Sequence, residues 1–217
     1  MSSEQIEDYL KNIFKIQSSE GKVGTTALSR KLGINPASVT EMIKKLAEEG
    51  IVTHTPYRGV RLTQEGRKRA LQIIRRHRLW EAFLVEVLKF DWHEIDEEAD
   101  RLEHLMSAKL EQHIDELLGF PRTDPHGDAI PSPGGSMADL PRASLDEVEE
   151  GDTVVVLRVS DASPEILRLA SKLGIALNRK IRVKERVRFD GTLRVSVGRK
   201  EQFISSKLAQ NIFVKAV

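Results

Sequence analysis

Apolar residues at helical spacing predict three helices within the first 50 residues of the chain. A short second helix is expected to follow Thr25 or Thr26, either of which can serve as its N-cap. A tight turn at Gly33 separates it from a third helix, which Asn35 can cap and which Pro36 suits as the first residue. The positions expected to point inward are Ile6, Tyr9, Leu10, Ile13, Phe14, Ala27, Leu28, Leu32, Val39, Met42, Ile43 and Leu46.

Helix, glycine turn and helix at this spacing are typical of the helix-turn-helix motif. The segments 51–54 and 59–62 have the composition of short strands and flank Pro56-Tyr57-Arg58. These strands predict a β-hairpin, or wing, beside the third helix. We therefore predict a winged helix-turn-helix DNA-binding domain over residues 1–72.

The middle of the chain keeps the helical period. One long helix is expected from Thr63 to about Leu88, and another from about His93 to Leu118. Residues 119–140 are rich in Pro and Gly and predict an ordered loop that becomes a linker. We assign residues 73–140 to a helical domain with this linker.

Beyond residue 140 the apolar pattern changes from that of helices to that of strands. Strands are expected at 153–157, 180–183, 193–197 and 212–214, with one helix at about 164–173. Several short strands in so short a segment predict a small SH3-like barrel over residues 141–217. The predicted fold class is therefore mainly α with a small β domain.

Charge is segregated along the chain, although the net charge is only +1. Residues 1–80 carry 15 Lys and Arg against 8 Asp and Glu, a net +7. Residues 81–150 carry 5 against 19, a net −14, and residues 151–217 carry 14 against 6, a net +8. The alternation suggests modules with different partners, and the basic first module suits DNA. The alternative for each block is an ordinary solvated surface.

Composition narrows the setting of the protein. No apolar run is long enough to span a membrane, and the first twenty residues lack the apolar core of a signal peptide. We therefore expect a cytoplasmic protein with no membrane partner. The chain has no cysteine, so disulfides and thiolate metal ligands are excluded.

The N-terminal part of the third helix is where a helix-turn-helix meets base edges in the major groove. The side chains expected to be exposed there, as candidates for base contacts, are Ala37, Ser38, Thr40 and Glu41. Lys44 and, in the wing, Arg58 are candidates for phosphate contacts, which position a protein without reading sequence. The alternative for each of these residues is plain helix or hairpin surface.

Acidic and histidine side chains recur at helical spacing in the middle of the chain. Asp100, Glu103 and His104 stand at i, i+3 and i+4, which brings them to one face of an α-helix. His77 and Glu81 are four residues apart on the preceding long helix, and antiparallel packing would let the two faces oppose each other. Carboxylates in one pocket repel one another, and a bound divalent cation removes this electrostatic repulsion. The alternative is a solvated acidic face with salt-bridged histidines.

Several motifs stand in order along nearly the whole chain. They are Glu7-Asp8-Tyr9-Leu10, Asn35-Pro36-Ala37-Ser38-Val39-Thr40, His77-Arg78-Leu79-Trp80-Glu81, Glu98-Ala99-Asp100-Arg101-Leu102-Glu103-His104, Pro125-His126-Gly127 and Ile130-Pro131. With these motifs the chain resembles the diphtheria-toxin-repressor family of iron- and manganese-dependent bacterial regulators. The longer members of that family carry an SH3-like tail, a FeoA-like domain.

The resemblance implies two metal sites in each subunit of a homodimer that binds double-stranded operator DNA. The residues matching the primary, regulatory site are Asp8, His77, Asp100, Glu103 and His104. The residues matching the second site are Glu81, Asp124, His126 and, from the C-terminal domain, Asp161. Dimerisation is expected from the acidic middle domain, and no small organic substrate is expected.

The metal ligands expected here are all oxygen or nitrogen. Iron-responsive relatives often present a sulfur ligand from the first helix, where this chain has Asp8. A hard ligand set favours Mn²⁺, with Fe²⁺ as the alternative. Lys11 stands where manganese-responsive relatives can carry an acid, so a further ion sharing that position is not expected.

The sequence predicts a metal-dependent repressor of manganese or iron uptake genes, with Mn²⁺ as co-repressor. One ion held by Asp8 and by the middle domain would fix the position of the winged helix. The third helices of the two subunits, which read the DNA, would then sit about 34 Å apart. The alternatives are an Fe²⁺-responsive regulator, a metal-responsive activator of the same fold, and a winged-helix regulator that senses an organic ligand or none. A metallohydrolase is a remote alternative, because the chain has neither an HExxH motif nor a Gly-rich phosphate loop.

Overall fold

The structure is a computed structural model that describes residues 3–55, 59–139 and 142–217, with Glu20 described in its backbone only. The chain divides into two compact units. The first contains the residues up to His77 together with 101–107 and 131–137. The second contains 78–100, 108–130 and the residues from 138 to the C-terminus.

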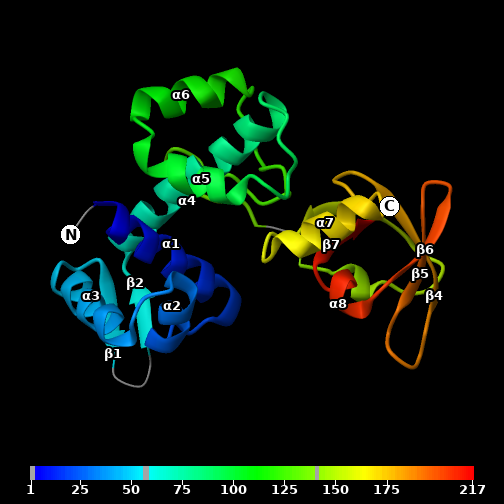
Figure 1. Cartoon of the computed structure of the whole chain (residues 1–217), viewed down its shortest axis with the longest axis horizontal. Coiled ribbons are helices and arrows are strands. Elements are labelled where there is room, and N and C mark those ends of the chain that lie inside the picture. The colour runs from blue at the N-terminus through cyan, green and yellow to red at the C-terminus, as the bar shows by residue number, and fades with distance from the viewer. Residues whose placement is uncertain (1–2, 56–58, 140–141) are drawn as a thin grey trace. The chain divides into compact units, whose positions relative to one another are not determined.

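The first unit is built on three helices and a hairpin (Figure 1). Its elements are α1 (Ser3–Glu20), α2 (Thr25–Leu32), α3 (Pro36–Glu48), β1 (Val52–Thr55), β2 (Gly59–Leu62) and the first part of α4 (Gln64–Glu86). The strands pair antiparallel from Val52 opposite Leu62 to Thr55 opposite Gly59. Apolar side chains of all three helices and the hairpin form one buried core, as the helical spacing predicts. The winged helix-turn-helix predicted from the sequence is confirmed.

Local chemistry fixes the turn between α2 and α3. Gly33 has φ +66°, the left-handed conformation that glycine adopts most readily at a helix end. The side chain of Asn35 accepts a hydrogen bond from the Ala37 amide at 2.8 Å, and Pro36 begins α3. The predicted N-cap of α2, Thr25 or Thr26, is wrong, because the helix already begins at Thr25 and Gly24 is its N-cap.

The acidic stretch after α4 is less regular than the sequence suggests. The single helix expected from His93 to Leu118 is instead α5 (Asp96–Leu102), a 3-10 turn η1 (Glu103–Leu105) and α6 (Ala108–Leu117). The backbone is extended at Met106, whose side chain is buried, and Ser107 directly precedes α6. The helical backbone is thus interrupted at Met106 without the glycine or proline that would mark the break in the sequence.

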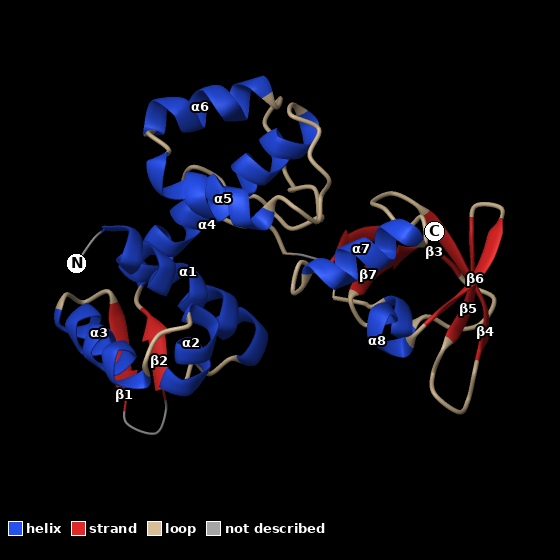
Figure 2. Cartoon of the chain, in the orientation of Figure 1, coloured by secondary structure: helices blue, strands red, loops and turns tan. Residues whose placement is uncertain are grey.

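The C-terminal part of the second unit is an antiparallel five-stranded sheet with strand order β6-β5-β4-β3-β7 (Figure 2). The strands are β3 (Thr153–Val159), β4 (Lys180–Arg186), β5 (Leu193–Val197), β6 (Lys200–Ile204) and β7 (Ile212–Ala216). The other elements of this part are η2 (Leu145–Glu147), α7 (Pro164–Lys172) and α8 (Ser206–Ala209). Alternate strand residues from Val154 to Val214 form a separate buried core, so this part is a domain of its own. Among the described residues, no helix is both long and apolar enough to cross a bilayer.

Candidate metal centres and nucleic-acid interface

One cluster of potential metal ligands joins α1 to the turn η1 within the first unit. Ligand atoms of Asp8, Glu103 and His104 all lie within 4.8 Å of one another. The His104 Nε2 is 3.2 Å from the Asp8 Oδ1 and 3.7 Å from the Glu103 Oε1. The turn that carries Glu103 and His104 therefore packs against α1, although Glu103 follows Asp8 by 95 positions in the sequence.

Glu7 orients the imidazole of His104. The His104 Nδ1 lies 2.7 Å from the Glu7 Oε2 and donates to this carboxylate, which leaves Nε2 directed at Asp8. Burial lowers the pKa of His104, but the hydrogen bond to Glu7 and the charges of Glu103 and Asp8 outweigh it and raise the pKa. Glu7 appears in the sequence only as part of a motif, and its role as partner of His104 was not predicted.

Glu103 is fully buried and is held by two cationic or potentially cationic groups. The His77 Nδ1 lies 2.6 Å from its Oε2, and the Lys11 Nζ lies 2.7 Å and 2.8 Å from Oε1 and Oε2. Burial raises the pKa of Glu103, but the hydrogen bond with His77 and the positive charges of His77 and Lys11 outweigh it, so the pKa is lowered. Glu103 is thus an anion in a buried setting, which is the state that binds a metal ion.

Asp100 is exposed in α5 and belongs to the second compact unit. The sequence predicts that Asp100 shares one α-helix with Glu103 and His104. That helix ends at Leu102, and the two later residues belong to the 3-10 turn η1, so the three residues do not share one α-helix.

A second cluster lies wholly within the second unit. Ligand atoms of Glu81, from α4, and of Asp124 and His126, from the loop after α6, all lie within 4.8 Å of one another. All three side chains are buried, with 1–4% of each residue exposed. Buried acids rarely gather in this way unless a cation or a proton joins them.

The ring of His126 is oriented in the way a metal ligand requires. Its Nε2 lies 2.7 Å from the carbonyl oxygen of Trp92, which can only accept a hydrogen bond, so Nε2 carries a proton. The opposite atom, Nδ1, is 3.6 Å from the Glu81 Oε1. It is buried and has no hydrogen-bond partner among the described residues. In the neutral ring its lone pair faces the two acids, so the residues fit a divalent cation.

The electrostatics of the second cluster favour a positive charge. Burial and the neighbouring Glu81 carboxylate raise the pKa of Asp124 to about 7, although the Arg78 guanidinium, 3.3 Å away, acts against the shift. Burial lowers the pKa of His126, but the charges of Glu81 and Asp124 outweigh it and raise the pKa. Without an ion, this cluster therefore retains protons that acids in water would have lost.

Asp161 lies just beyond β3, and its charge also acts on His126. The loop that carries His126 packs directly on β3: the Val159 amide donates to the His126 carbonyl oxygen at 2.9 Å. Gly127 has φ +93°, and a Cβ there would lie 2.1 Å from the Leu157 carbonyl oxygen, so only glycine permits this approach. The C-terminal domain thereby contributes charge next to the cluster.

The predicted reading helix α3 presents a largely polar surface. Ala37, Ser38, Glu41 and Lys44 are exposed, whereas Thr40 is half-buried and its hydroxyl donates to the Pro36 carbonyl oxygen at 2.9 Å. The Thr40 hydroxyl can therefore serve a base only as an acceptor. Arg58, predicted to contact phosphate, lies outside the described residues.

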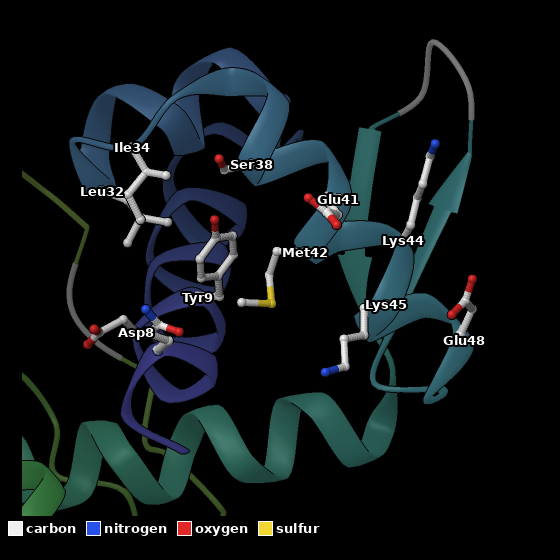
Figure 3. A pocket seen from close by; sticks show the side chains of 11 residues that line it. Asp8, Tyr9, Leu32, Ile34, Ser38, Glu41, Met42, Lys44, Lys45 and Glu48 are labelled. Carbon is white, nitrogen blue, oxygen red and sulfur yellow. The ribbon is translucent and has the colours of Figure 1, made fainter. Parts of the chain in front are cut away.

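A pocket of about 730 Å³ opens between α1 and α3 (Figure 3). Asp8 and Tyr9 line it from α1, and Ser38, Glu41 and Met42 line it from α3. Asp8 is therefore both a member of the first cluster and a neighbour of the predicted base-reading residues. This position places the candidate metal ligand of α1 beside the predicted reading helix.

A winged helix with two His and carboxylate clusters defines a metal-dependent DNA-binding regulator. Three family models match the chain: the iron dependent repressor N-terminal DNA binding domain (residues 1–60), the iron dependent repressor metal binding and dimerisation domain (63–132) and the FeoA domain (143–216). The chain belongs to this iron-dependent repressor family, which includes the diphtheria toxin repressor. It is accordingly a metal-dependent transcriptional repressor and not an enzyme.

Individual relatives cover both iron and manganese regulators. An uncharacterized HTH-type transcriptional regulator of Methanocaldococcus jannaschii is 39% identical over 52% of this chain and 90% of its own length. The iron-dependent repressor IdeR of Mycobacterium tuberculosis is 32% identical over 70% of this chain and 69% of its own. A solved manganese-dependent transcriptional repressor in complex with manganese has a TM-score of 0.89 at 41% identity, covering 98% of this chain and 100% of the other.

Proposed function

We propose that this protein is a cytoplasmic Mn²⁺-dependent repressor of manganese or iron uptake genes that binds operator DNA as a homodimer with two ions per subunit. The observation that carries the proposal is the donor set of the two clusters. Every candidate ligand is a carboxylate or an imidazole, and the 217 residues include no cysteine. Hard oxygen ligands with imidazole suit Mn²⁺ better than sulfur-rich sets do.

The proposed primary site consists of Asp8, His77, Asp100, Glu103 and His104. Support comes from the close approach of Asp8, Glu103 and His104 and from the contact between His77 and Glu103. A bound divalent cation supplies positive charge that neutralises these carboxylates. Glu7 then positions His104, and Asp8 ties the site to α1, beside the reading helix.

The proposed second site consists of Glu81, Asp124, His126 and Asp161. Support comes from the buried Nδ1 of His126 and from the raised pKa of Asp124, both of which favour a cation. Asp161 joins this set because its charge acts on His126. Since these residues come from α4, the loop at 124–126 and the segment after β3, an ion here holds the C-terminal domain to the helical part.

DNA recognition is assigned to the exposed face of α3 and to the wing. Ala37, Ser38, Thr40 and Glu41 are proposed to meet base edges, and Lys44 and Arg58 to meet phosphates. The exposure of Ala37, Ser38, Glu41 and Lys44 and the basic charge of residues 1–80 support this assignment.

Operator binding in the presence of different metals tests the proposal. An operator is first selected from genomic fragments with Mn²⁺ present, and gel shifts are then run with Mn²⁺, Fe²⁺ (under anaerobic conditions), Zn²⁺ or a chelator. We expect tight binding with Mn²⁺ and loss of binding with chelator. Binding that responds to Fe²⁺ at lower free concentration than to Mn²⁺ would instead assign the protein to iron, and binding unaffected by chelator would contradict metal control.

A further inference from the structure

Lys11 contacts Glu103, a member of the first cluster. It lies on α1, three residues after Asp8, and only 5% of the residue is exposed. Its Nζ is 2.7 Å from the Glu103 Oε1, 2.8 Å from the Glu103 Oε2 and 3.4 Å from the His77 Nδ1. A buried ammonium group thus contacts two of the residues assigned to the primary metal site.

The contact uses both oxygens of Glu103 at once. If a divalent cation bound this carboxylate with the ammonium group still in place, two positive charges would lie close together and repel each other. Removing the lysine without adding a metal would leave a fully buried carboxylate with less neutralising charge. The ammonium group of Lys11 and a metal ion would therefore each neutralise the Glu103 carboxylate.

We propose that Lys11 is a tethered cation that neutralises Glu103 in the metal-free protein and that a divalent ion must displace. Lys11 thereby sets the metal concentration at which the primary site fills. This inference rests on the proposed primary site and adds a specificity-determining residue to it. Displacement needs no large movement of the backbone, because the ammonium group of lysine is carried on a flexible four-carbon chain.

Two roles of Lys11, as a competing cation or as a structural ion pair, predict different changes in metal affinity. A competing cation weakens metal binding, so its removal tightens the site. A structural ion pair that persists in the metal-bound form supports the ligand geometry, so its removal weakens the site or leaves it unchanged. The sign of the change in Mn²⁺ affinity therefore distinguishes the two roles.

The test compares Mn²⁺ affinities by isothermal titration of the full-length chain, each variant carrying His126→Ala to remove the proposed second site. Lys11→Met keeps the length of the side chain and removes its charge. We expect it to bind Mn²⁺ at least about tenfold more tightly, the gain that follows if the lysine-displaced form is no more than about a tenth of metal-free molecules. Equal or weaker binding overturns the proposal.

Two controls accompany Lys11→Met. Lys22→Met removes one positive charge from an exposed position just after α1 and should leave the affinity unchanged. Lys11→Arg keeps the charge and should show no tenfold gain. A gain of similar size in Lys22→Met would assign the effect to overall charge and overturn the proposal.

Melting temperatures of the same variants give a second readout. Metal-free Lys11→Met should melt below the His126→Ala chain with native Lys11, and Mn²⁺ should raise its melting temperature more than it raises that of this reference chain. If Lys11→Met does not fold without metal, Lys11→Gln is titrated instead, and the same gain in affinity is required. Absence of Mn²⁺ binding by the chain with native Lys11 would contradict the proposed function, whereas binding that Lys11→Met does not improve contradicts only the role of Lys11.

Discussion

Two side chains of the second cluster hold protons more firmly than they do in water. Burial and the Glu81 carboxylate raise the pKa of Asp124 to about 7, and the same acids outweigh burial to raise the pKa of His126. A metal ion binds the ionised carboxylate and the neutral imidazole. Protons must therefore leave this cluster as an ion enters it.

We predict that Mn²⁺ binding at the second site weakens as the pH falls below about 7, the pKa of Asp124 in the folded protein. Below this pH the carboxyl is protonated and must release its proton; well above it, the carboxylate is already ionised. Titrations at pH 6 and pH 8, in buffers of different ionisation enthalpy, measure the number of protons released. The wild type should release more at pH 6 than Asp124→Asn does, and equal release by the two proteins would contradict the prediction.

At the scale of single residues, the candidate metal ligands can be found from the sequence, whereas the residues that hydrogen-bond to these ligands cannot. The acids and histidines of the two clusters stand in motifs that can be located along the chain. Glu7 and Lys11 could not be given their roles in this way, because their partners His104 and Glu103 lie 97 and 92 residues away. Only the packing of α1 against the turn η1 brings these side chains together.

At the scale of elements, the loop that carries Asp124 and His126 depends on one glycine. Gly127 has φ +93°, and its Cα lies so close to β3 that an added Cβ would be 2.1 Å from the Leu157 carbonyl oxygen. We predict that Gly127→Ala lowers the free energy of unfolding by about 1–3 kcal/mol and weakens binding at the second site, because the loop must withdraw from β3. Thermal melting and Mn²⁺ titration measure the two effects.

The same loop region offers a matched control for this substitution. A Cβ on Gly134 would meet only the Ser132 Oγ, at 3.8 Å, which is an ordinary contact. Gly134→Ala should therefore leave both the melting temperature and metal binding near those of the wild type. A Gly127→Ala protein that melts and binds like Gly134→Ala would show that the loop is not fixed by its contact with β3.

The elements themselves were predictable where the apolar period was uninterrupted. The three helices of the winged helix, the hairpin and four of the five C-terminal strands follow from it. The fifth, β6, was missed because it is an edge strand whose residues from Lys200 to Gln202 are polar. The break between α5 and α6 was missed because residues 103–107 contain neither glycine nor proline, so the extended backbone at Met106 has no local signal in the sequence.

At the scale of the whole molecule, the segregated charge agrees with the order of the functional domains along the chain. The basic residues 1–80 include the DNA-binding domain, and the acidic residues 81–150 include most of the metal-binding and dimerisation domain. Overall net charge hides this division. The domain boundaries placed at 72 and 140 from the sequence alone stay a prediction.

Metal binding and operator binding should be coupled, because Asp8 belongs to the first cluster and also lines the pocket beside Ser38 and Glu41 of α3. Coupling between two ligands is reciprocal: if Mn²⁺ tightens operator binding by some factor, the operator must tighten Mn²⁺ binding by the same factor. We predict equal factors in two titrations of the dimer, one of Mn²⁺ with and without saturating operator and one of operator with and without saturating Mn²⁺. A tenfold effect corresponds to about 1.4 kcal/mol of coupling free energy.

Asp8→Asn should reduce both factors together, since it loosens the connection between the metal and α1. If it abolished Mn²⁺ binding at the first cluster but left the operator's dependence on Mn²⁺ unchanged, the second cluster alone would carry the response, and the role assigned to Asp8 would be wrong.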